Sequence, residues 1–114
     1  MDDGARQRLW RLLGLGVRGR GVVVGVQQVR VAARKNQVSL AIVASDASRN
    51  SMEKIVPLLN ARRVRFVEVP SAAALGAAVG RDQTAVVGIV DPQLAAGVRE
   101  LLSAASPRTT EEDV

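Results

Sequence analysis

The sequence contains no cysteine and no histidine, and these two absences exclude most common catalytic and metal sites. Without cysteine there is no disulfide, no thiol nucleophile and no thiolate-bound metal. Without histidine the chain lacks the commonest metal ligand and the commonest general base at neutral pH. A conventional hydrolase triad and a zinc centre are therefore excluded, and we expect neither an enzyme nor a protein with a cofactor.

Aromatic residues are also scarce, since the chain has one Trp, one Phe and no Tyr. Val, Leu, Ile and Ala must therefore fill the hydrophobic core, and 114 residues are the usual size of one domain. No apolar run approaches the ~20 residues that a membrane span needs. The acidic start Met1-Asp2-Asp3 lacks a signal-peptide pattern. We expect a cytoplasmic protein without a membrane partner.

Positive charge is concentrated in the first part of the chain. The net charge is +5, yet 13 of the 16 Lys and Arg residues lie between residues 4 and 65, where only Asp46 and Glu53 oppose them. A high genomic GC content would explain the preference for Arg over Lys, but not this asymmetry. The distribution is typical of a protein that binds a polyanion, because Arg forms bidentate bonds with phosphate and stacks on bases.

Hydrophobic periodicity predicts helices that alternate with strands. The expected helices cover residues 5–15, 26–35, 48–62, 72–79 and 93–104. Continuous apolar or β-branched runs predict strands over residues 22–24, 40–44, 64–69 and 85–90. We expect the glycine-rich segment after the first helix to be a loop that carries Arg18 and Arg20, and Pro57 to kink or shorten the third helix.

Alternating helices and buried strands predict an α/β protein, built as a three-layer α/β/α sandwich around a mixed, mainly buried central sheet. Asn36 is expected to end the second helix, and Asp91 with Pro92 to start the last one. We expect a single domain over residues 1–104 and a disordered acidic tail over residues 105–114.

Three short segments are candidates for a binding site. Gly25 precedes Gln27 and Gln28 at the start of a helix, where free N–H groups can meet phosphate and glutamine amides can bond to base edges. Residues 44–48 follow the central strand, where ligand sites form in α/β sheets. Residues 75–80 contain small residues that let a short helix pack closely.

Each segment also has an ordinary structural explanation. The two glutamines can be solvent-facing residues of a surface helix, and Asp46 and Ser48 can simply cap the next helix. Residues 75–80 can be no more than a turn. A phosphate-binding loop of the usual kind is disfavoured, because the glycines at positions 14–21 lack the G-x-G-x-x-G spacing after a strand.

Taken in order, the motifs resemble those of the kink-turn-binding ribosomal protein superfamily, which includes bacterial ribosomal-protein-like paralogues. The resemblance covers about residues 8–103. It is carried by Leu-Gly-Leu at 13–15, Gly25 with its polar pair, Ala-x-Asp-Ala-Ser at 44–48, Leu-Gly-x-Ala-x-Gly at 75–80 and Val-Gly-Ile-Val-Asp at 87–91.

This resemblance implies a monomeric α/β/α sandwich that grips a kink-turn, an RNA bend closed by tandem G·A pairs. By position, Gln27 and Gln28 would contact the G·A pairs. Ser48 and Met52 on one side, and residues 81–86 on the other, would hold a flipped-out nucleotide. The cations expected to contact phosphates are Arg6, Arg8, Arg11, Arg18, Arg20, Arg30, Arg34 and Lys35.

The chain departs from the family pattern at four places. Gln28 and Ser45 stand where a Glu is usual, and Val31 stands where a Lys is common. The loop at 81–84 lacks the apolar residues that many kink-turn binders place there. These departures concern RNA specificity rather than the fold, because direct readout depends on such side chains.

Our expectation is therefore a non-catalytic protein that binds structured RNA, either a kink-turn or a related bent RNA of ribosomal or regulatory origin. Association with the ribosome stays open. The alternative is a protein-interaction module of the same fold, associated with the translation machinery, whose basic surface docks on an acidic protein or on the ribosome.

Overall fold

The computed structural model describes residues 2–105 as five helices and four strands. In chain order the elements are α1 (Asp3–Arg18), β1 (Val22–Val24), α2 (Val26–Arg34), β2 (Leu40–Ala44), α3 (Arg49–Ala61), β3 (Phe66–Val69), α4 (Ala72–Ala78), β4 (Val86–Ile89) and α5 (Pro92–Ala105). None of these helices is both long and apolar enough to cross a membrane. Most of the predicted acidic tail lies outside the described residues.

The four strands form one mixed sheet in the order β1-β4-β2-β3. β2 and β3 run parallel, whereas β4 lies antiparallel to both β1 and β2. Every residue of the two central strands, β2 and β4, is buried. The predicted mixed sheet with a buried centre is confirmed.

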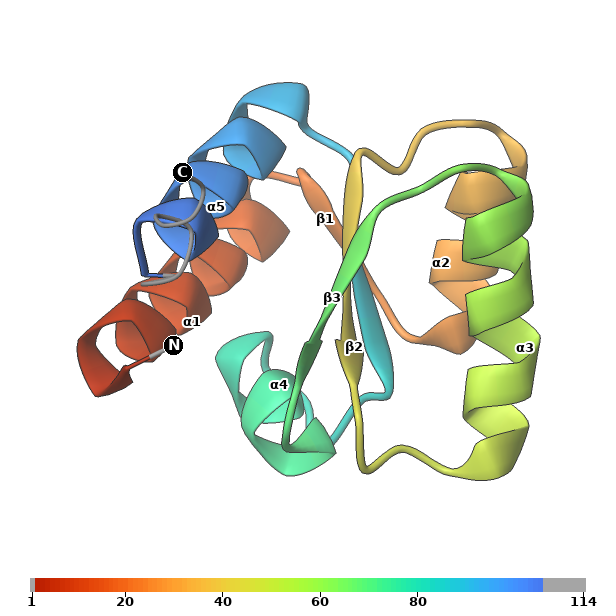
Figure 1. The fold of residues 1–114 in the computed structure, drawn as a ribbon, viewed down its shortest axis with the longest axis horizontal. Helices are drawn as coiled ribbons and strands as arrows, with labels where there is room; N and C mark the ends of the chain where they lie inside the picture. The colour runs from red at the N-terminus through yellow and green to blue at the C-terminus, as the bar shows by residue number, and fades with distance from the viewer. Residues whose placement is uncertain (1, 106–114) are drawn as a thin grey trace, which may run out of the picture.

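Helices cover both faces of this sheet, which confirms the three-layer sandwich (Figure 1). α1, α4 and α5 lie against one face, and α2 and α3 lie against the other. Successive side chains of a strand point to opposite faces. In β2, Leu40 and Ile42 therefore pack under the first layer, whereas Ala41 and Val43 pack under the second. Two covered faces explain why the strand is apolar at every position.

The predicted end of the first helix at Leu15 is wrong, because α1 continues through Gly14 and Gly16 to Arg18. Gly16 is buried, and a Cβ at this position would lie 2.5 Å from side-chain carbons of both Leu94 and Val22. This glycine therefore allows α1 to pack closely on α5 and β1 and does not form a turn. The loop that follows is only three residues long.

Pro57 does not end α3, which continues to Ala61, so the predicted early break does not occur. Proline removes the hydrogen bond to the carbonyl of Glu53. Pro57 and Glu53 are both exposed, so water can reach that carbonyl. Other predicted boundaries are close to the observed ones: Asn36 has a left-handed φ of 59° just after α2, and Asp91 caps α5 through a 2.9 Å bond from the Gln93 N–H.

Candidate functional site

A cavity of about 490 Å³ lies at the edge of the sheet where β2 ends and β4 begins. Four parts of the chain line it: Val26 at the start of α2, the loop after β2 with Ser48, Ala72 at the start of α4, and the loop before β4 with Gln83 and Thr84. Figure 1 shows these segments at the lower edge of the sheet. The structure therefore brings together the start of the first candidate segment, the loop of the second, and the loop at 81–86 that the family resemblance implied, whereas residues 75–80 do not line the cavity.

Asp46 joins two of these loops. Its Oδ1 accepts a 2.8 Å hydrogen bond from the backbone N–H of Ala72, the first residue of α4. The simplest structural explanation, that Asp46 caps the helix following it, is therefore incorrect. Ser48 provides that cap, since its Oγ accepts from the Ser51 N–H at 3.1 Å. Asp46 instead holds the loop after β2 against a helix that begins 26 residues later.

The loop between α4 and β4 is held in place by Gly76. A Cβ on this buried residue would lie 2.4 Å from the Cα of Gln83, so only glycine allows the loop to approach. The Arg81 N–H donates to the Gly76 carbonyl at 2.8 Å, and the Thr84 N–H donates to the Ala72 carbonyl at 3.1 Å. The buried Thr84 hydroxyl donates to the Val86 carbonyl at 3.1 Å. The Leu-Gly motif therefore positions one wall of the cavity.

Gly25 directs α2 toward the same cavity. Its φ of 96° and ψ of 157° belong to a region that is essentially restricted to glycine. A Cβ here would meet nothing within 4 Å, so the requirement for glycine comes from the backbone and not from crowding. The Gly25 N–H donates to the Val86 carbonyl at 3.0 Å, which fixes the start of α2 beside the start of β4.

The first turn of α2 exposes hydrogen-bond donors. Gln27 and Gln28 are exposed, and Gly25 provides no side-chain cap. Within residues 2–105, the backbone N–H groups of Val26, Gln27 and Gln28 have no protein acceptor. A helix N-terminus with free N–H groups favours an anion, both through these donors and through the helix dipole.

The basic residues predicted for this site do not all lie beside the cavity. Arg30 is half-buried and donates a 2.6 Å hydrogen bond to the Lys54 carbonyl, so it ties α2 to α3. Arg34 and Lys35 lie at the far end of α2, about 10 Å along the helix axis from Gln27. Arg18 and Arg20 precede β1, at the edge of the sheet opposite to the cavity.

Met52 is separate from the cavity as well. It lines a shallow groove of about 370 Å³ between α3 and β3, together with Val56 and Phe66. Ser48, four residues earlier, lines the cavity itself. The predicted contact of Met52 with a flipped-out nucleotide therefore stays a prediction that this geometry does not favour.

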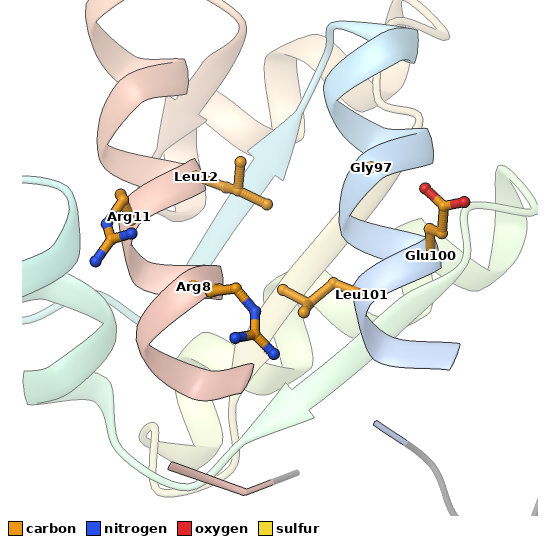
Figure 2. Close-up of a pocket in the computed structure, with 6 residues that line it drawn as sticks. All are labelled: Arg8, Arg11, Leu12, Gly97, Glu100 and Leu101. Atoms are coloured by element: carbon orange, nitrogen blue, oxygen red, sulfur yellow. The ribbon is translucent and has the colours of Figure 1, made fainter. Parts of the chain in front are cut away.

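A second cavity, which sequence reasoning missed, lies between α1 and α5. Figure 2 shows Leu12 and Leu101 pointing toward one another across this groove of about 480 Å³, with Arg8 beside them. The sequence signal was weak, because Leu12 was simply one member of the apolar face of an amphipathic helix. Arg8 and Arg11 line this groove, which places them apart from the cavity at the sheet edge.

Metal binding has no support in residues 2–105, since no three Asp or Glu side chains there are close enough to hold an ion. The polar groups around the main cavity are hydroxyls, amides, backbone N–H groups and the carboxylate of Asp46. Such groups can donate hydrogen bonds to an organic ligand and accept them from it.

Comparison with known sequences identifies relatives over most of the chain. Residues 8–100 match the model of the ribosomal protein L7Ae/L30e/S12e/Gadd45 family. The chain is 34% identical over 91 residues to the RNA-binding protein YlxQ of Bacillus subtilis (strain 168). This alignment covers 80% of this chain and 91% of the relative. The chain is 29% identical over 102 residues to the RNA-binding protein YlxQ of Enterococcus faecium, with 90% and 98% covered.

Solved structures show the same fold. A protein of unknown function from Bacillus halodurans C superposes with a TM-score of 0.74 at 29% identity, covering 82% of this chain and 95% of that one. The Giardia lamblia 15.5kD RNA binding protein superposes with a TM-score of 0.69 at 20% identity, covering 89% and 92%. At that identity the second similarity concerns the fold alone.

Proposed function

Because the chain belongs to the ribosomal protein L7Ae/L30e/S12e/Gadd45 family, we propose that it is a non-catalytic protein that binds structured RNA. The two relatives from Bacillus subtilis and Enterococcus faecium are both named RNA-binding proteins, which supports this proposal. We propose as its target a kink-turn or a related bent RNA. In this proposal the protein acts in the cytoplasm as a monomer.

The main support for the proposal is that distant segments of the chain converge on one cavity. The start of α2, the loop after β2 and the loop before β4 are far apart in the sequence, yet they line the same space. Its volume of about 490 Å³ is in the range of pockets that hold small organic ligands. An unstacked nucleotide is such a ligand, and sequence-specific RNA recognition commonly uses splayed-out bases.

Polar groups in the cavity suit the edges of a base. Gln83 supplies an amide that can donate and accept, whereas the Ser48 hydroxyl, which donates to Ser51 Oγ at 3.1 Å, keeps a lone pair that can accept. Oδ1 of Asp46 is occupied by the Ala72 N–H, which leaves its second oxygen to accept from a base amino group. In this proposal the cavity holds the flipped-out nucleotide of the bend.

The start of α2 then meets the paired part of the bend. Gln27 and Gln28 project from the first turn, where exposed amides can bond to the edges of G·A pairs. The free N–H groups of the same turn donate hydrogen bonds to phosphate oxygens. Because Gln28 is neutral where the family usually has Glu, its bond to a guanine amino group is weaker than a charge-assisted one.

A gel-shift titration tests this proposal by comparing a kink-turn RNA with the same RNA bearing disrupted G·A pairs. Wild-type protein should prefer the intact RNA, and Gln28→Ala should reduce that preference by about tenfold, the value of one base contact of 1–3 kcal/mol. Gln7→Ala, which removes an exposed glutamine from α1, is the matched control and should leave the preference unchanged. If Gln28→Ala and Gln7→Ala behave alike, the reading role of Gln28 is wrong.

A second candidate function is a protein-interaction module of the same fold. The groove between α1 and α5 favours it, because its apolar floor of Leu12 and Leu101 lies beside Arg8 and Glu100. A purified chain that is free of nucleic acid and binds neither RNA in the titration would support this function over the first.

A further inference from the structure

The edge of the sheet opposite to the cavity is strongly basic. β2 and β3 begin there, β4 ends there, and α2 and α3 end beside them. Six exposed cations belong to the segments that form this edge: Arg20, Arg34, Lys35, Arg62, Arg63 and Arg65. We refer to these six residues as the basic edge. Arg18, at the end of α1, adjoins it.

Hydrogen bonds between the loops make the basic edge continuous. The Val90 N–H donates to Gly21 at 2.8 Å, and the Ser39 N–H donates to Ile89 at 2.8 Å. These bonds connect the loop after α1 to the ends of β4 and α2. On the other side, Nη1 of Arg62 donates to Oδ1 of Asn36 at 3.2 Å, which joins the ends of α2 and α3. Neighbouring strands lie ~4.8 Å apart, so the edge extends about 14 Å from β1 to β3.

Little negative charge opposes these cations. Among the described segments that form this edge, Asp91 is the only carboxylate, and its Oδ1 already caps α5. Within residues 2–105, none of the six cations forms an ion pair. Six unpaired cations on one edge repel one another, and a polyanion is the ligand that relieves this repulsion.

Backbone conformation gives a second, independent indication. The described residues include three non-glycine residues with a positive φ, and all three lie in the turns of this edge: Arg20 at 62°, Asn36 at 59° and Arg63 at 58°. Glycine adopts this conformation without strain, whereas arginine does not. The chain therefore keeps an arginine side chain at two turns where the backbone favours glycine.

The composition of the edge favours phosphates over a protein partner. Stable protein interfaces are anchored by apolar or aromatic residues at their centre. The large hydrophobic residues that are exposed among residues 2–105, Leu15 and Val31, lie on helices and not in these turns. A surface made of cations without an apolar anchor is typical of proteins that bind a nucleic-acid backbone independently of its sequence.

We propose that the basic edge is a second RNA-binding surface, which contacts the phosphate backbone of a double-stranded RNA stem. This proposal rests on the RNA-binding function proposed above. The five residues of β2 separate the basic edge from the cavity by about 17 Å. The two surfaces therefore contact different segments of the RNA. The cavity edge reads a bend, and the basic edge holds a stem without regard to its sequence.

The test uses a blunt RNA duplex of about 20 base pairs without bulges or G·A pairs, titrated with the full chain at several salt concentrations. The informative variant is Arg20→Gly with Arg63→Gly, because glycine removes both charges at positions where it also relieves the backbone. The control, Lys54→Gln with Arg99→Gln, removes two exposed cations from α3 and α5. Each protein is also titrated with the intact and disrupted kink-turn RNAs.

We expect the double glycine variant to bind the duplex about tenfold more weakly, and its dependence of log K on log salt to be lower by about 2, one unit for each lost phosphate contact. The control should stay within twofold of wild type, and both variants should still prefer the intact kink-turn. A wild-type chain that ignores the duplex at low salt overturns the proposal, as does an equal loss in both variants. A wild-type chain that binds the duplex as expected but does not prefer the intact kink-turn would contradict the proposed kink-turn function, whereas the proposal for the basic edge would still hold.

Discussion

Replacement of Gly76 by alanine should destabilise the protein through one close contact. The added Cβ would lie 2.4 Å from the Cα of Gln83 and 2.7 Å from its N and C atoms. These are backbone atoms, so no side-chain rotation relieves the overlap. An ordinary contact begins near 3.4 Å, so the loop must move by about 1 Å.

The cost of this movement can be estimated from its parts. Overpacking of this kind costs about 1–3 kcal/mol, and the better helix propensity of alanine returns about 0.5–1 kcal/mol. The bonds from Arg81 to Gly76 and from Thr84 to Ala72 lengthen as the loop moves, at up to about 1 kcal/mol each. A net loss of about 1–3 kcal/mol corresponds to a decrease of about 5–15 °C in Tm for a domain of this size.

Thermal unfolding followed by circular dichroism measures this effect. Gly97→Ala is the matched control, because Gly97 also lies within a helix but a Cβ there would meet nothing within 4 Å. Its Tm should rise by a few degrees, in line with the gain in helix propensity. A Gly76→Ala protein with a Tm equal to or above that of wild type would refute the close packing of this loop.

Three further substitutions test the supports of the cavity. Gly25→Ala should lower the free energy of unfolding in urea by about 1–3 kcal/mol, because alanine is strained at a φ of 96° although there is space for its Cβ. An unchanged urea midpoint would contradict this backbone requirement. Asp46→Ala should lower the free energy of unfolding by about 1 kcal/mol, because the cap on the Ala72 N–H of α4 is lost. The control Asp82→Ala changes an exposed residue of the neighbouring loop and should alter this free energy by less than about 0.5 kcal/mol. Equal effects of the two substitutions would argue against the cap. Thr84→Val should lower the free energy of unfolding by about 1 kcal/mol, because the hydrogen bond to the Val86 carbonyl is lost. If this variant unfolds at the same urea midpoint as wild type, the bond contributes nothing to stability.

The elements that were predicted well are those whose signal is local. β2 was predicted at its observed bounds, because a strand covered on both faces must be apolar at every position. Asp91 was correctly predicted at the start of the last helix because a cap acts within three residues of its own position. The family motifs also pointed to the correct sandwich.

The errors concern contacts between distant residues. The end of α1 was misplaced because Gly16 resembles a turn residue until its neighbours Leu94 and Val22 are known. The role of Asp46 was missed because its partner, Ala72, lies 26 residues away. A glycine or a carboxylate has the same local appearance whether it ends a helix or contacts another element.

The candidate site was predicted in part for the same reason. The start of α2 and the loop after β2 could be named in advance, since each lies at an end of a predicted strand or helix, and the family resemblance named the loop at 81–86. The concentration of cations at the edge opposite to the cavity could not be predicted, because charge along the sequence does not show where α2 and α3 end in space. Arg20 and Arg63 are 43 positions apart in the sequence, yet both lie in turns on one edge.

Backbone amide shifts in a two-dimensional ¹⁵N NMR titration with kink-turn RNA would locate the bound RNA on the surface of the protein. The largest changes should occur at residues 26–28, whose N–H groups have no protein acceptor among the described residues, and at residues 83–85 in the opposite wall of the cavity. The amides around Leu12 and Leu101 in the groove between α1 and α5 should change little. Changes centred on that groove, with residues 26–28 unmoved, would contradict the assignment of the cavity as the site that binds the bend.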